Sequence, residues 1–150
     1  MKRFTFRLER LLQLREAAEQ EKARNLGVAL QEEDVAKQAV TEGQARRDEA
    51  VGQLARISQA PAQAGLLRNL ELSVEQLTHQ LHLLNEAHAK ALARVDAERS
   101  AFEEARMAKR VIERLKEQRR EAWTQELARH EQSLSDETAS YLARENGRDE

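Results

Sequence analysis

The chain has 150 residues, and 91 of them are Ala, Glu, Leu, Arg or Lys, which favour helices. Only 14 residues are Val, Ile or Thr and there is one Pro, so the composition excludes sandwiches, barrels and α/β folds. The 25 basic and 27 acidic side chains nearly cancel and Cys is absent, which argues against a general attraction to nucleic acid and excludes disulfide chemistry.

The first predicted element is a helix over residues about 5–57. It is followed by residues 58–65, a segment that contains Pro61 and Gly65 and no charged side chain. Pro61 has no N–H to donate and Gly65 has no Cβ, so a helix should stop in this segment. The segment is short, and we therefore predict a tight reversal of the chain.

The second predicted helix covers residues about 66–144 and has the clearest periodicity in the sequence. Its apolar side chains recur at alternating steps of three and four, which is the repeat of a coiled coil. Such a stripe stays on one side of the helix only if the helix supercoils around a partner, and an extra residue near Arg119 predicts local unwinding there. The predicted seam positions are Leu67, Leu70, Val74, Leu77, Leu81, Leu84, His88, Ala91, Val95, Glu98, Phe102, Ala105, Lys109 and Ile112, followed by Leu115, Arg119, Trp123, Leu127, His130, Leu134 and Tyr141.

Reversal of the chain at residues 58–65 makes the helices antiparallel and pairs residues whose numbers sum to about 123. The second helix then runs past the first from about Trp123 onward, and Phe4 lies opposite residue 119. We therefore predict an all-α fold, a long antiparallel two-helix coiled-coil hairpin with an overhanging C-terminal helix, in a single domain over residues 1–150. The predicted apolar pairs are Ile57 with Leu66, Leu54 with Leu70, Leu12 with Val111 and Leu8 with Leu115.

Motifs of catalysis are absent from the sequence: it has no phosphate-binding loop, no His-Glu-x-x-His and no Gly-x-Ser-x-Gly elbow. His88 occupies a seam position, where a polar group fixes the register of the helices, and a pH sensor is the alternative interpretation. We expect no enzymatic activity, no cofactor, no metal and no small-molecule substrate. Four polar residues share one helical surface, and we interpret them as a solvated face rather than as metal ligands: Glu75, His79, His82 and Glu86.

Basic side chains concentrate at the predicted open end of the hairpin. Residues 106–120 hold seven basic and two acidic side chains, and the predicted pairing places them beside Arg3, Arg7, Arg10 and Arg15. Like charges brought together favour a partner with an acidic surface. Few aromatic side chains are available to stack on bases, so an acidic protein is favoured over nucleic acid.

Two segments of the chain resemble the flagellar export protein FliJ family, and together they cover about a third of it. The family opens with a phenylalanine-arginine-leucine, leucine-rich, arginine-glutamate pattern, and it carries a leucine-lysine-glutamate helix followed by an aspartate-glutamate-x-alanine box near the other end. The resemblance implies an antiparallel coiled coil like the shaft subunit of rotary ATPases. The matching residues here are Phe4-Thr-Phe6-Arg7-Leu8-Glu9-Arg10-Leu11-Leu12, Arg15-Glu16, Val111-Ile-Glu113-Arg-Leu115-Lys116-Glu117 and Asp136-Glu137-Thr-Ala139.

This resemblance implies a component of the flagellar type III export apparatus. Such proteins act as a stalk in the hexameric export ATPase, contact the membrane export gate and escort export chaperones. The open end suits the ATPase contact, for which we predict Arg7, Leu8, Arg10, Leu11, Arg110, Arg114 and Leu115. Near the turn, where the family often carries aromatic residues, this sequence has the aliphatic residues Val51, Leu54, Leu66 and Leu70, which are the predicted export-gate contact.

The expected location is the cytoplasm, with peripheral association at the cytoplasmic face of the flagellar base. No apolar run approaches the ~20 residues that cross a bilayer, and charged side chains interrupt the amino-terminal stretch. Three other interpretations remain at this stage. They are the equivalent stalk of a virulence type III secretion system, a structural coiled-coil scaffold that self-associates, and a nucleic-acid binder that uses residues 106–120.

Overall fold

The computed structural model describes residues 3–59 and 64–146, and these form two long helices and no strand. Helix α1 covers Glu9–Ser58 and helix α2 covers Ala64–Asn146. The predicted all-α class is therefore confirmed. The chain falls into two compact units: the terminal unit, residues 1–18 and 105–150, and the hairpin unit, residues 19–104. Pro61, on which the predicted reversal rests, lies outside the described residues.

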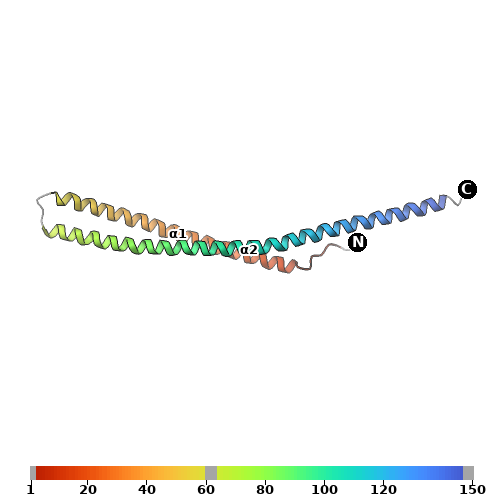
Figure 1. Cartoon of the computed structure of the whole chain (residues 1–150), viewed down its shortest axis with the longest axis horizontal. Coiled ribbons are helices and arrows are strands. Elements are labelled where there is room, and N and C mark those ends of the chain that lie inside the picture. The colour runs from red at the N-terminus through yellow and green to blue at the C-terminus, as the bar shows by residue number, and fades with distance from the viewer. Residues whose placement is uncertain (1–2, 60–63, 147–150) are drawn as a thin grey trace. The chain divides into compact units, whose positions relative to one another are not determined.

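In the hairpin unit, α1 and α2 run side by side in opposite directions (Figure 1). The predicted seam of α2 is confirmed here, since all ten seam positions from Leu67 to Glu98 are buried or half-buried. Every other residue of α2 between 64 and 100 is exposed. A repeat of 3.5 residues thus turns one narrow face of α2 toward α1, as in a supercoiled pair.

Helix α1 meets this seam partly with small side chains. Ala29, Ala36, Gly43 and Ala50 follow one another at intervals of seven residues, and none of them is exposed. A Cβ on Gly43 would lie 2.8 Å from Cδ1 of Leu84, so the leucine occupies the space that a side chain would need. Small residues at these positions therefore let the leucines of α2 pack close to the backbone of α1.

The pairs expected near Leu66 and Val111 are wrong. Leu66 is 46% exposed and Val111 is 65% exposed, whereas Leu67 and Ile112 are at least half-buried. Successive residues of a helix point about 100° apart. A pairing rule based on one average sum of residue numbers can therefore be off by one residue and select a side chain that faces away from the other helix. Within each unit, residues of α1 or of the N-terminal segment contact residues of α2. The residue numbers of these contacting pairs sum to between 121 and 127.

Residues 3–8 of the terminal unit are not helical. Helix α1 starts at Glu9 rather than at about residue 5, and the Glu9 N–H donates to the carbonyl of Phe6 at 3.1 Å. The Phe4 ring lies 5.9 Å from the Trp123 ring, so the prediction that places it opposite residue 119 is wrong. Extended chain advances about 3.3 Å per residue against 1.5 Å in a helix, so this segment reaches further along α2 than a helix would.

Beyond the N-terminal segment, α2 continues with no other described part of the chain beside it (Figure 1). All residues from 128 to 144 are exposed, and we call this part of α2 the overhang. The predicted seam therefore ends at Leu127, which is half-buried, and within it the predicted position Arg119 is wrong, because that side chain is exposed. Its continuation through His130, Leu134 and Tyr141 faces solvent, and the Tyr141 side chain is 76% exposed. Among the described residues, no helix has the length and apolar character needed to cross a membrane.

Candidate functional site

Nine arginines gather in the terminal unit, and all of them are exposed. Residues 3–18 and 105–123 together hold eleven basic and five acidic side chains, an excess of six positive charges. Exposed guanidinium groups keep their charge and form bidentate contacts with carboxylates. We call these nine residues the basic surface: Arg3, Arg7, Arg10, Arg15, Arg106, Arg110, Arg114, Arg119 and Arg120.

An aromatic groove lies on the terminal unit, between the N-terminal segment and α2. The non-helical residues 3–8 form one wall, and residues 115–126 of α2 form the other. Its lining combines apolar and aromatic side chains with three arginines and one carboxylate. The groove is lined by Arg3, Phe4, Thr5, Phe6, Arg7, Leu8, Leu115, Arg119, Ala122, Trp123 and Glu126.

Three contacts hold the N-terminal segment against α2. The Lys116 ammonium lies 2.7 Å from a Glu9 carboxylate oxygen and 6.0 Å from the centre of the Phe6 ring. The tilted Phe4 and Trp123 rings form the third contact. Both charged groups of the ion pair remain partly exposed, so solvent screens it, and the aromatic packing carries more of the stabilisation.

A second, polar groove runs along the same unit beside Leu12. Arg110, Arg114, Lys116 and Arg120 line it together with three glutamates, so its charges are mixed in sign. The carboxylates are Glu16, Glu113 and Glu117. Because positive and negative groups are mixed here, the attraction for an acidic partner is weaker per unit area than at the aromatic groove.

The predicted ATPase-contact residues are divided between these two grooves. Arg7, Leu8 and Leu115 line the aromatic groove, while Arg110 and Arg114 line the polar groove. Exposed Arg10 and half-buried Leu11 line neither of the two. The sequence-based set lacks Phe4, Phe6, Arg119 and Trp123, although two phenylalanines ahead of a helix and the single Trp of the chain were a usable signal.

The predicted gate-contact residues lie in the hairpin unit and differ in exposure. Leu54 and Leu70 are half-buried at the helix interface, whereas Val51 is 44% exposed and Leu66 is also open to solvent. Only the latter two offer much surface to a partner.

Polar groups elsewhere form local pairs. His82 Nε2 lies 3.3 Å from Glu86, while Glu75 and His79 are exposed, and the described residues contain no group of three or more acidic, His or Cys side chains placed to hold a metal. His88 is different, because its Nε2 lies 2.7 Å from a Glu33 oxygen across the helix interface. These two side chains are 22% and 20% exposed. Such a pair fits the register role predicted for His88.

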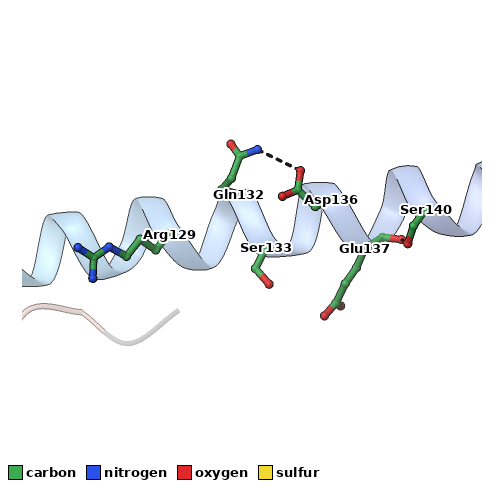
Figure 2. A pocket seen from close by; sticks show the side chains of 6 residues that line it. All are labelled: Arg129, Gln132, Ser133, Asp136, Glu137 and Ser140. Carbon is green, nitrogen blue, oxygen red and sulfur yellow. Dashed lines mark hydrogen bonds between the residues drawn. The ribbon is translucent and has the colours of Figure 1, made fainter.

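A shallow hollow on the overhang has no enclosing walls. Figure 2 shows its six side chains on successive turns of α2, with a hydrogen bond of 3.0 Å from Gln132 to Asp136. One helix cannot surround a ligand, so this hollow is a solvated helix face.

Comparison with known proteins gave one family. The model of the flagellar FliJ protein family matches residues 4–148, nearly the whole chain. No curated protein and no solved structure matched. The match spans both segments on which the resemblance rests, together with the helical part between them. The chain therefore belongs to the FliJ family of flagellar proteins and is a component of the flagellar export apparatus.

Proposed function

We propose that this protein is the coiled-coil stalk of the hexameric export ATPase and docks into the ATPase ring through its terminal unit. The observation that carries the proposal is the basic surface beside an apolar groove. Nine exposed arginines are concentrated there, while apolar side chains such as Phe6 and Leu115 line the groove between them. A central hole lined by acidic and apolar side chains complements both features.

Charge and apolar surface have separate roles in this docking. Long-range attraction raises the rate at which the terminal unit meets an acidic ring, and it weakens with salt because the Debye length is about 8 Å at physiological ionic strength. Burial of Phe6, Leu8 and Leu115 then stabilises the docked state. A single chain in a six-fold ring contacts the subunits unequally, which would bias their assembly and their cycle.

The hairpin unit is the part we propose to meet other export components. Val51 and Leu66 are its exposed aliphatic side chains among the predicted gate contacts, and they are the ones available to the membrane export gate. Export chaperones are further partners of this type of protein. The proposed location is cytoplasmic, at the inner face of the flagellar base, and the family favours this role over a virulence secretion system.

The test is charge reversal within the terminal unit. The double substitution Arg7→Glu and Arg10→Glu should weaken ATPase binding and lower the stimulation of ATP hydrolysis, with the loss largest at low salt. Helix content should not change, because both side chains are exposed. Binding is measured with the purified ATPase, and helix content by circular dichroism.

The matched control makes the same change of charge in the hairpin unit. Arg46→Glu and Arg68→Glu alter two arginines that are also exposed and lie outside the terminal unit. This control should retain ATPase stimulation. If both double variants lose stimulation equally, or if neither does, the terminal unit is not the docking end.

A further inference from the structure

The overhang has an apolar stripe that none of the described residues, 3–59 and 64–146, covers. Leu134, Tyr141 and Leu142 are each more than half exposed and line one side of the helix together with Glu137. The overhang holds three acidic side chains, Glu131, Asp136 and Glu137, and its two arginines, Arg129 and Arg144, lie near its two ends, outside the stretch 130–143. The stripe is thus apolar with acidic neighbours, which is the complement of the aromatic groove and its arginines.

The overhang cannot reach the groove of its own chain. Trp123 lines the groove and Leu134 lies eleven residues further along the same continuous helix, about 16 Å away at 1.5 Å per residue. A helix does not fold back over such a distance. The overhang of a second copy has no such restriction.

We propose that two copies of this chain form an antiparallel pair in which each overhang lies in the aromatic groove of the other. Groove and overhang are adjacent on α2, so one two-fold axis allows both contacts to form at once and closes the assembly at two chains. A register in which residue numbers sum to 256 or 257 places Trp123 opposite Leu134, and Leu115 opposite Tyr141 and Leu142. The same register places Arg119 opposite Glu137.

In this dimer, part of the proposed ATPase contact is covered. A second copy in the aromatic groove covers Arg7 and Leu8, which are also residues of the ATPase contact proposed above. Dimerisation and ring docking would then exclude each other, and the overhang of the second copy would occupy the groove until the ATPase displaces it. The competition rests on the proposed function, whereas the self-association does not.

The test uses the full-length chain and three variants in sedimentation velocity experiments at low and high salt. The unmodified chain should sediment at low salt with a mass approaching twice 17.2 kDa, and dissociate as salt rises. The single substitution Arg119→Glu places two carboxylates opposite each other, because position 119 faces Glu137 of the other copy, and it should raise the dissociation constant at least tenfold. The single substitution Glu137→Arg places two arginines opposite each other and should also raise the dissociation constant at least tenfold.

The double variant Arg119→Glu with Glu137→Arg restores opposite charges in the pair and should recover dimerisation. Arg119 and Glu137 are exposed and lie eighteen residues apart on one helix, so they cannot rescue each other within a single chain. Trp123 is the only Trp, and its emission should shift with protein concentration in the chains that dimerise.

A chain that stays monomeric at low salt and high concentration overturns the proposal. So does a dimer that neither single reversal weakens, or a double variant no better than the single ones. If Glu137→Arg weakens ATPase binding while every chain is monomeric, the overhang belongs to the ATPase contact and the self-association is refuted. Loss of ATPase binding by the Arg7 and Arg10 reversal is measured separately, so failure of either proposal can be recognised.

Discussion

Replacement of Leu81 by Ala tests the seam most directly. Leu81 is 8% exposed, and one of its δ carbons would lie 3.6 Å from a Cβ built on Gly43. Large-to-small substitutions of buried leucines cost about 2–5 kcal/mol, from lost apolar transfer and from the cavity that remains. Only one helix faces the void here and it can move inward, so we expect a loss of about 2–3 kcal/mol in the free energy of unfolding of the hairpin unit.

The matched control is Leu83→Ala, two positions further along the same helix. Leu83 is 50% exposed and Ala is at least as good a helix former, so the expected loss is under about 0.5 kcal/mol. Urea unfolding followed by far-ultraviolet circular dichroism measures both. Equal losses for Leu81→Ala and Leu83→Ala would refute the assignment of the seam.

The other predictions concern the glycines, the half-buried pair of Glu33 and His88, and the N-terminal segment. Gly27→Ala should raise stability by about 1 kcal/mol, because a Cβ there meets nothing within 4 Å. Gly43→Ala should gain clearly less, since its Cβ would displace Leu84, and equal gains in thermal unfolding would contradict the close approach. A double-mutant cycle on Glu33 and His88 should give a coupling energy of about 1–2 kcal/mol. The exposed pair His82 and Glu86 should give a coupling energy under about 0.5 kcal/mol. A larger coupling energy for the exposed pair would disprove the register role of His88. Phe4→Ala should shift the emission of Trp123 without loss of helix content, while Leu14→Ala should leave it unchanged, and an unaltered spectrum in the Phe4 variant would mean that the segment does not pack on α2.

The seam of α2 could be predicted because one physical requirement determines it. A coiled coil buries a stripe of period 3.5, and bulky residues such as Leu77 and Leu81 mark that stripe in the sequence. The same argument succeeds for His88, a polar residue, since periodicity rather than residue type assigned its position. It fails past Leu127, because a repeat does not reveal whether a partner helix is present.

The face of α1 was harder to predict because small side chains form it. Ala36, Gly43 and Ala50 are not distinguished by hydrophobicity from the many other alanines of the chain. Their importance appears only when Leu84 is placed against Gly43. Packing thus depends on which residue of one helix lies against which residue of the other. The hydrophobic pattern of a single helix does not contain that information.

The charge of the proposed docking surface could be predicted from the sequence, but its shape could not. The arginines of the terminal unit could be counted in the sequence, and the helix pairing brought them to one end. The aromatic groove required the N-terminal residues to be extended, whereas their propensity allowed a helix. Packing of Phe4 on Trp123 decided between the two, and this contact is not local in sequence.

Site-specific photocrosslinking tests the proposed stalk function most directly. A benzoylphenylalanine at position 8, on the rim of the aromatic groove, replaces a residue of the proposed docking end, and one at position 83 replaces an exposed leucine of the hairpin unit. With the assembled ATPase hexamer, the account predicts a crosslink to the ATPase from position 8 and none from position 83. A crosslink from position 83 alone, or from neither position while the proteins remain bound, would contradict docking through the terminal unit.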